Sequence, residues 1–355
     1  MMKNLVTLVC LMAIFLTMPL QNLASQENTH AFTVEKNVPW AMPDSLALTM
    51  DIYTPSTGKP SYPVIIIYHG GGWLINTNAM MDSMAIYLSS HAEYVVCNVN
   101  YRLLGDHNNT VQMNQIVEDA TGAVIWVSEH IAAYKGNSSQ IIVTGDSAGG
   151  HLAAMVMLCC CPKDISPIAT SFPNFWPTGL TPDKNQYDIL QQTGSQIKAA
   201  VLSYPDLDVH KTCVLGFETV LNPFWSMANV KGRGIFGDTI SVRTHPELYE
   251  SLSPINNIPP FSERLLPPQL VMVGTRDIVV PPSWTRKYVT MCREAGQPIE
   301  FWEYKGKPHA FLDAIHNPLM GNVFHRDAPL ALNQMILFLD NIFFSPSQAL
   351  TFPGN

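Results

Sequence analysis

Apolar runs alternate along this chain with segments of helical spacing. Six of the runs are rich in β-branched and aromatic residues, which is typical of strands buried on both faces of a sheet. They cover residues 63–68, 94–99, 140–144, 198–204, 269–273 and 299–304. Two further stretches, residues 31–38 and 46–54, alternate apolar and polar positions and predict an antiparallel edge of the sheet.

Helical patterns separate the predicted strands. In residues 111–134 the apolar side chains recur with a helical period, for example at Ile116, Ala120 and Val124. Residues 147–160, 281–296 and 328–343 also predict helices. Strands and helices that alternate in this way predict an α/β fold, with a mostly parallel, doubly wound sheet and helices on both of its faces.

Two long segments interrupt the alternation. Residues 162–196 and 206–260 are rich in proline, asparagine and aromatic residues, and neither carries a strand pattern. Compact domains rarely contain structureless connections of this length, so we expect lid-forming insertions that shape a binding site. The second segment is predicted to be the main lid of a single domain over residues 26–355.

The first 25 residues have the layout of a secretory signal peptide. Lys3 precedes an apolar stretch over residues 5–18, and the small residues Ala24 and Ser25 follow. The alternative is an uncleaved anchor, but the apolar stretch is short for a membrane span. We expect a secreted or periplasmic protein with no stable membrane insertion after the signal is cleaved.

Composition narrows the range of partners. Of the 355 residues, 47% are hydrophobic and 14% are charged, and the formal net charge is −8. This balance supplies a full core and argues against nucleic acid as a partner. The cysteine run at residues 159–161 lacks the spacing and the nearby histidines of a metal site. No metal or organic cofactor is predicted, and the oligomeric state is left open.

A candidate nucleophile stands between a predicted strand and a predicted helix. The sequence Gly145-Asp146-Ser147-Ala148-Gly149 fits Gly-x-Ser-x-Gly. On a sharp strand-to-helix turn a serine hydroxyl is exposed, and the glycines avoid clashes at the tight corner. An ordinary glycine-serine turn is the alternative explanation, but the flanking strand and helix favour a nucleophile.

A glycine-rich turn follows the first of the long apolar runs. It reads His69-Gly70-Gly71-Gly72-Trp73. Consecutive glycines let backbone N–H groups approach a substrate oxygen closely. The turn therefore predicts an oxyanion hole, completed by the N–H of Ala148, whereas the alternative is a merely flexible turn.

A serine nucleophile needs a base and a carboxylate that orients the base. His309 follows the last predicted strand and Asp277 follows the preceding one, so both are expected at the carboxyl edge of the sheet. The order Ser147, Asp277, His309 is that of α/β hydrolases. The residues set aside are His151 and Asp146 beside the nucleophile, Asp313 behind His309, and His210 and His245 in the predicted lid, where they could touch substrate.

Together these motifs resemble the hormone-sensitive-lipase-like branch of esterases within the α/β-hydrolase fold. The resemblance rests on HGGGW, on YRL at residues 101–103, on GDSAGGHLA at 145–153, on GTRD at 274–277 and on PHAF at 308–311. It implies a triad of Ser147, His309 and Asp277, with an oxyanion hole made by the N–H groups of Gly71, Gly72 and Ala148. The proline-rich continuation common in that branch does not follow residue 103, and the usual N-terminal cap helices are short or absent. These differences favour secreted relatives that resemble carbohydrate acetyl esterases.

The predicted function is that of a serine carboxylesterase acting on short acyl esters, with a small molecule or an acetylated glycan as substrate. A peptidase or amidase with the same triad is the first alternative, and a binding protein on a hydrolase scaffold is the second. Aromatic residues of the insertions could contact substrate or form the lid's own core. The expected substrate contacts are Trp73, Phe224 and Trp225, and the other aromatic candidates are Phe172, Phe175 and Trp176.

Overall fold

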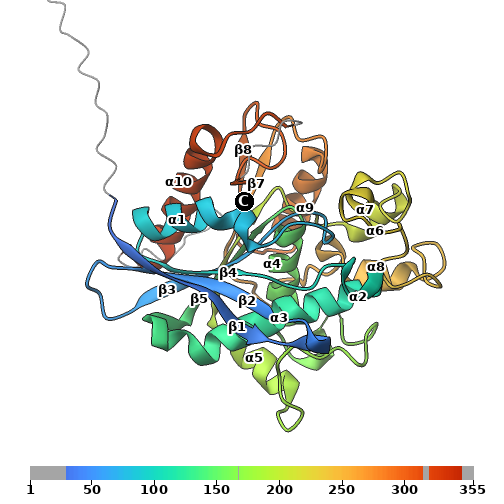
Figure 1. Ribbon diagram of the computed structural model, residues 1–355, viewed down its shortest axis with the longest axis horizontal. Helices are drawn as coiled ribbons and strands as arrows, with labels where there is room; N and C mark the ends of the chain where they lie inside the picture. The colour runs from blue at the N-terminus through green and yellow to red at the C-terminus, as the bar shows by residue number, and fades with distance from the viewer. Residues whose placement is uncertain (1–28, 167, 315–319, 346–355) are drawn as a thin grey trace, which may run out of the picture.

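An eight-stranded sheet forms the centre of the computed structural model, which describes residues 29–166, 168–314 and 320–345 (Figure 1). The strand order is β1-β2-β4-β3-β5-β6-β7-β8. β1 and β2 pair antiparallel, as do β2 and β4, and every other neighbouring pair is parallel. The strands are β1 Phe32–Ala41, β2 Leu48–Pro55, β3 Tyr62–Tyr68, β4 Val95–Val99, β5 Gly136–Asp146, β6 Ile197–Ser203, β7 Gln269–Gly274 and β8 Ile299–Tyr304. The predicted mostly parallel sheet with an antiparallel edge is confirmed.

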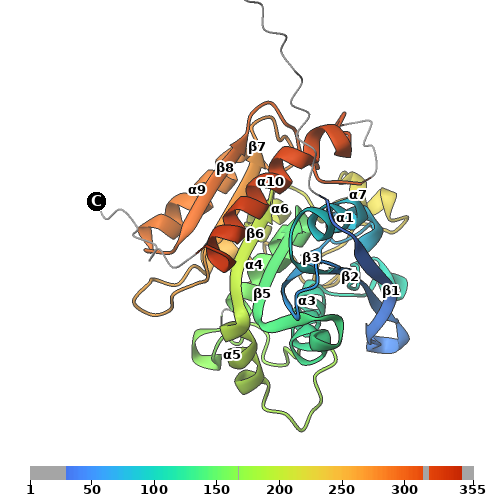
Figure 2. The same cartoon turned by 90° about the vertical axis from the view of Figure 1, so that its left-hand side faces the viewer.

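Helices cover both faces of the sheet. They are α1 Asp82–His91, α2 Asp106–Asn109, α3 Met113–His130, α4 Ala148–Cys159, α5 Gln186–Gln196, α6 Val209–Val214, α7 Pro223–Met227, α8 Pro246–Ser251, α9 Pro282–Glu294 and α10 Phe324–Phe343. The 3-10 turns are Pro43–Ser45, Asn78–Met81, Ile131–Tyr134, Lys163–Ile165 and Pro254–Asn256. The apolar sides of α3, α4 and α9 belong to one buried cluster, and those of α1 and α10 belong to the other. Figure 2 shows α10 and α9 running beside the strands of the second half of the sheet.

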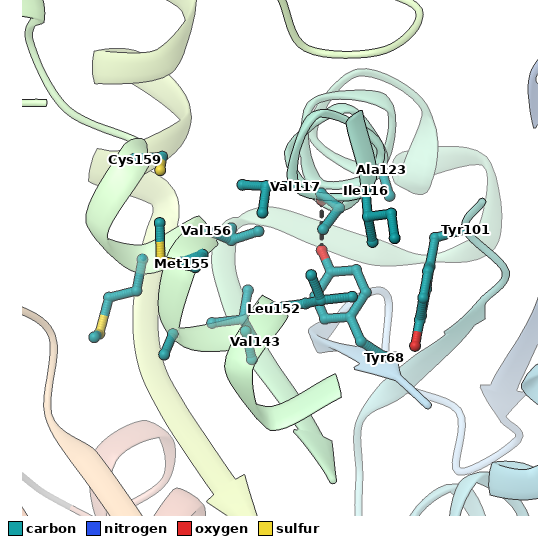
Figure 3. Packing of buried hydrophobic residues seen from close by; sticks show 14 of the residues in the cluster. Tyr68, Tyr101, Ile116, Val117, Ala123, Val143, Leu152, Met155, Val156 and Cys159 are labelled. Carbon is teal, nitrogen blue, oxygen red and sulfur yellow. Dashed lines mark hydrogen bonds between the residues drawn. The ribbon is translucent and has the colours of Figure 1, made fainter. Parts of the chain in front are cut away.

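The core between β3 and the neighbouring helices shows why these segments fold as they do. Every residue of β3 is buried, as its β-branched run predicted. Tyr68 at the end of β3 donates a hydrogen bond of 2.7 Å to the carbonyl of Ala120 in α3 (Figure 3). Leu152 of α4 packs beside Tyr68 in the same cluster (Figure 3). Because β5 leads directly into α4, this packing fixes the turn between them.

Some boundaries differ from the sequence pattern. The helix predicted over residues 111–134 ends at His130 and continues as a 3-10 turn, Ile131–Tyr134. α1 was not predicted, because its buried positions surround most of the helix and include Ser89 and Ser90 rather than forming one apolar stripe. No described helix is both long enough and apolar enough to cross a membrane. The predicted signal peptide lies outside the described residues.

The two insertions lie apart from each other. The first, residues 162–196, carries α5, which packs against α3, β5 and β6. The second, residues 206–260, carries α6, α7 and α8, which gather at another end of the molecule (Figure 1). We call residues 206–260 the lid.

All six cysteines in the described part of the chain are buried free thiols. Cys159 is the last residue of α4, and Cys160 and Cys161 follow it. The guanidinium of Arg264 donates to the carbonyls of Met157 and Leu158 at 2.6 and 2.8 Å. Arg264 thus satisfies carbonyl groups that the end of a helix leaves without partners.

Candidate active site

Ser147 lies in the turn between β5 and α4, with a φ of 52° and a ψ of −117°. This left-handed backbone is rare for a residue with a side chain, and the surroundings enforce it. The Ser147 N–H donates to the carbonyl of Ser203 in β6 at 2.9 Å. A side chain at Gly149 would overlap the carbonyl of Tyr68, so only glycine lets the helix start this close to β3.

His309 links Ser147 to Asp277. Its Nε2 lies 2.8 Å from the Ser147 Oγ, and its Nδ1 lies 2.7 Å from the Asp277 Oδ2. A carboxylate beside Nδ1 holds the proton on that nitrogen, which leaves the lone pair of Nε2 facing the serine hydroxyl. The structure brings together the three residues that the sequence placed in a triad.

Further contacts fix the positions of Asp277 and His309. The other carboxylate oxygen of Asp277 accepts hydrogen bonds of 2.9 Å from the N–H groups of Val279 and Val280. The Asn322 amide donates to the carbonyl of His309 at 2.5 Å. The ring of Tyr204 meets the imidazole edge-on, with ring centroids 4.7 Å apart. Since these contacts fix the carboxylate and the imidazole, little reorganisation is needed for proton transfer.

The glycine-rich turn is fastened to the serine turn by Asp146. The Asp146 Oδ1 accepts a hydrogen bond of 2.6 Å from the Gly70 N–H. Burial raises the pKa of Asp146 to about 6. Gly71 and Gly72 have φ values of 115° and 59°, which favour glycine. Neither of their N–H groups donates to a main-chain carbonyl within the described segments, so both are available for an oxyanion.

A cavity of about 660 Å³ opens beside Ser147. Gly72, Trp73 and Ala148 form its wall next to the serine, while the lid and residues 278–284 form the rest. Phe224 of α7 lies close to the glycine turn. A Cβ atom added at Gly72 would be only 3.2 Å from the Phe224 ring. Trp73 and Phe224 therefore line the cavity, although the Trp73 residue is only 1% exposed, and Gly71 is not among the lining residues.

Trp225 corrects one expected substrate contact. Its side chain is 1% exposed, and its indole N–H donates to the carbonyl of Phe217 at 2.6 Å. The ring of Phe217 lies 6.1 Å away, and the Arg233 guanidinium lies 5.9 Å from the Trp225 ring. Trp225 is part of the lid's own core, because it is buried and is not among the residues that line the cavity, whereas its neighbour Phe224 is.

No described residue of the first insertion lines this cavity, which corrects its expected role as part of the lid. Phe172 packs against Phe236, with ring centroids 5.4 Å apart. Phe175 is buried in the same hydrophobic cluster as α3 and α4. Trp176 donates its indole N–H to the carbonyl of Leu180 at 2.8 Å. These aromatic side chains of the first insertion therefore stabilise the fold and do not line the cavity.

The histidines that the sequence set aside lie elsewhere. His151 is fully buried, and its Nε2 is 2.8 Å from the carbonyl of Leu252. Burial lowers the pKa of His151 to about 4. His210 and His245 do not line the cavity. No group of three histidine, cysteine, aspartate or glutamate side chains in the described residues is arranged to hold a metal ion.

Two charged residues of the cavity were not predicted. Asp206 follows β6 as Asp277 follows β7, so its place after a parallel strand was a usable signal. Its carboxylate accepts a hydrogen bond of 2.7 Å from the Thr212 hydroxyl, and burial raises its pKa to about 6. Arg243 also lines the cavity, and nothing in the sequence around it pointed there.

Relatives of known name share this sequence over much of its length. The chain is 25% identical to Esterase LipC of Mycobacterium tuberculosis over 287 residues, which are 78% of this chain and 59% of that protein. It is 34% identical over 105 residues to Carboxylesterase NlhH of the same species, covering 30% of this chain and 32% of NlhH. It is 24% identical to the Arabidopsis thaliana isoprenylcysteine alpha-carbonyl methylesterase ICME over 277 residues, covering 77% of this chain and 56% of ICME. The chain thus spans less than two thirds of the length of each of these relatives.

Solved structures share the fold. The native structure of Est2, a thermophilic esterase from the Planctomycetes species Thermogutta terrifontis, aligns with a TM-score of 0.61 at 23% identity. The alignment covers 91% of this chain and 96% of Est2. This likeness confirms the predicted α/β-hydrolase fold. The sequence profile of the BD-FAE family matches residues 50–290, and on that match the chain belongs to the BD-FAE family of α/β-hydrolase-fold proteins.

Proposed function

We propose that this protein is a serine carboxylesterase that hydrolyses short acyl esters. The observation that carries the proposal is the hydrogen-bonded series Ser147–His309–Asp277 beside a cavity. The names of the esterase relatives support the same reaction class. The glycine-rich turn facing Ser147 supplies the donors that acyl transfer requires.

In the proposed reaction His309 accepts the proton of the Ser147 hydroxyl as the oxygen attacks the ester carbonyl. Asp277 stabilises the imidazolium that forms. The bond to the alcohol then breaks, and the alcohol leaves with the proton from His309. Water, activated by the same imidazole, attacks the acyl-enzyme and releases the acid.

Negative charge develops on the carbonyl oxygen during both attacks. The N–H groups of Gly71, Gly72 and Ala148 are the proposed donors to that oxygen. Ala148 also begins α4, and the positive end of the helix dipole favours the same charge. The loss of one donor of this kind costs about 2.7–4 kcal/mol of barrier.

Acetylated carbohydrates stay among the proposed substrates, on the strength of the sequence resemblance. We also propose that the protein is exported and that residues 1–25 are removed. Mass spectrometry of the N-terminus after secretion by the native host tests the export proposal, and a mature protein that retains Met1 would contradict it.

The activity is tested with a nitrophenyl ester series from acetate to decanoate, using the mature protein and Ser147→Ala in parallel. We expect fast hydrolysis of the short esters that is lost in the variant. A peptide and formamide panel measured alongside separates an esterase from an amidase with the same triad. Equal hydrolysis by both proteins, or no hydrolysis at all, would overturn the proposal.

A further inference from the structure

Among the described residues that line the cavity beside Ser147, one carries a positive charge without a partner. Arg243 is exposed, and it is the one lysine, arginine or histidine among the residues that line the cavity. It forms no hydrogen bond or ion pair with any residue in the described part of the chain. A guanidinium in that state keeps its five donors free for a ligand.

Most other arginines of the chain have partners. Three pair with carboxylates, namely Arg102 with Asp119, Arg286 with Glu303 and Arg326 with Asp327. Arg233 and Arg264 donate instead to main-chain carbonyls. Of the three without such a side-chain partner among the described residues, Arg243, Arg276 and Arg293, Arg243 alone faces the cavity of Ser147.

Much of the wall of this cavity is apolar. Large apolar side chains that line the cavity remain exposed: Val214 is 57% exposed, Leu215 66%, Leu221 88% and Ile278 81%. Exposed apolar groups that gather in this way mark a binding surface. Attraction between opposite charges is also stronger beside apolar walls than in open water.

Asp206 is the single acidic side chain among the described residues that line the cavity. Asp206 is next to the nucleophile, because its N–H donates to the carbonyl of Ser147 at 3.3 Å. A negative group on the substrate is repelled from the neighbourhood of Asp206 and attracted toward Arg243. The two charges therefore favour an anionic group of the substrate at Arg243 over one beside Asp206.

We propose that Arg243 is a specificity-determining residue, which binds a carboxylate on the non-reacting end of an ester with an apolar body. This inference rests on the proposed function, and it names the substrate class of that site. The guanidinium fork matches a carboxylate with two parallel hydrogen bonds, and the apolar mouth contacts the body of the substrate.

Two pairs of esters test the proposal, because the carboxylate could belong to the acyl side or to the alcohol side. The acyl pair is mono-4-nitrophenyl suberate and 4-nitrophenyl octanoate, which have equal chain length. The alcohol pair is 4-acetoxybenzoate and 4-methylphenyl acetate. The ratio of kcat/KM for the anionic ester to kcat/KM for the neutral ester is measured for wild type, Arg243→Gln, Arg243→Glu and the control Arg293→Gln.

We expect Arg243→Gln to lower that ratio about tenfold in one of the pairs, as the loss of a charged hydrogen bond predicts. Arg243→Glu lowers it further, added salt weakens the wild-type preference, and Arg293→Gln keeps the wild-type ratio. Equal ratios in all four proteins for both pairs would overturn the proposal.

Binding without turnover separates this proposal from the esterase proposal. In Ser147→Ala protein, calorimetry measures the Kd of each ester with Arg243 present and with Arg243→Gln added. A Kd for the anionic ester that rises about tenfold supports the anion site even if no ester is hydrolysed. An unchanged Kd counts against the site even if the esterase activity is established.

Discussion

The carboxylate of Asp146 accepts a hydrogen bond of 2.6 Å from the backbone N–H of Gly70, and so joins the serine turn to the glycine-rich turn. These two turns come from different strands, β5 and β3, which are parallel neighbours. This buried contact therefore helps to set the spacing between the nucleophile and the proposed oxyanion donors.

Loss of that contact is expected to affect turnover. Asp146→Ala leaves the Gly70 N–H without its partner, and we expect kcat for nitrophenyl acetate to fall about 10- to 100-fold, part of what a whole oxyanion donor contributes. Asp146→Asn is the matched control, because its amide oxygen can still accept the hydrogen bond. Steady-state kinetics of both variants check this, and equal losses would show that the charge matters rather than the contact.

Replacing Asp277 is expected to lower kcat far more than replacing Asp313. Asp277→Asn removes the acceptor that holds the Nδ1 proton of His309, and we expect kcat to fall by about 10⁴. Burial, together with the charge of Asp146, raises the pKa of Asp313 well above its usual value. Asparagine therefore resembles the protonated form of Asp313, and Asp313→Asn should keep kcat within about threefold. A larger loss in Asp313→Asn than in Asp277→Asn would contradict the assignment of the acid.

Asp206 should make the protein less stable as the pH rises. Burial raises its folded-state pKa from 3.8 to about 6, so between these values the folded state holds the proton more tightly than the unfolded state does. From pH 5 to pH 7 this group should lower the free energy of unfolding by about 1 kcal/mol. Urea unfolding at both pH values measures the change. In Asp206→Asn the fall in the free energy of unfolding between pH 5 and pH 7 should be smaller by about 1 kcal/mol. An identical pH dependence in both proteins would refute the prediction.

Neighbouring aromatic residues of α7 should separate binding from stability. Phe224→Ala opens the cavity beside Gly72, and we expect kcat/KM to change about tenfold with little effect on unfolding. Trp225→Ala empties a buried site and should lower the free energy of unfolding by about 3–5 kcal/mol. Kinetics and urea unfolding of both variants provide the test, and the reverse pattern would place Trp225 in the site after all.

The sequence was sufficient for the parts that depend on local chain geometry. A serine between a strand and a helix, and two residues that follow successive parallel strands, must meet at one edge of the sheet. That is why Ser147, Asp277 and His309 were found together. β3 and residues 141–146 of β5 were equally clear, since both of their faces are buried.

Features that depend on packing between distant segments could not be predicted from the sequence. Phe224 and Trp225 are adjacent in a helix of five residues, and no periodic pattern over so short a helix tells which of them faces the cavity. Arg243 lies in an irregular part of the lid, so only the folded chain brings it to the cavity that Ser147 lines. The first insertion has the same composition as the lid, yet α5 packs against α3 and the sheet instead.

The buried free cysteines have a practical consequence. Burial raises the pKa of the Cys160 thiol after α4 and of the Cys292 thiol in α9 to about 12, so the native protein holds them in the unreactive protonated form. No disulfide joins the six cysteines of the described residues, so assembly of the described core needs no oxidant. The rate at which an alkylating reagent labels each of these thiols therefore measures how often the surrounding part of the core opens, because a buried thiol reacts only while it is exposed.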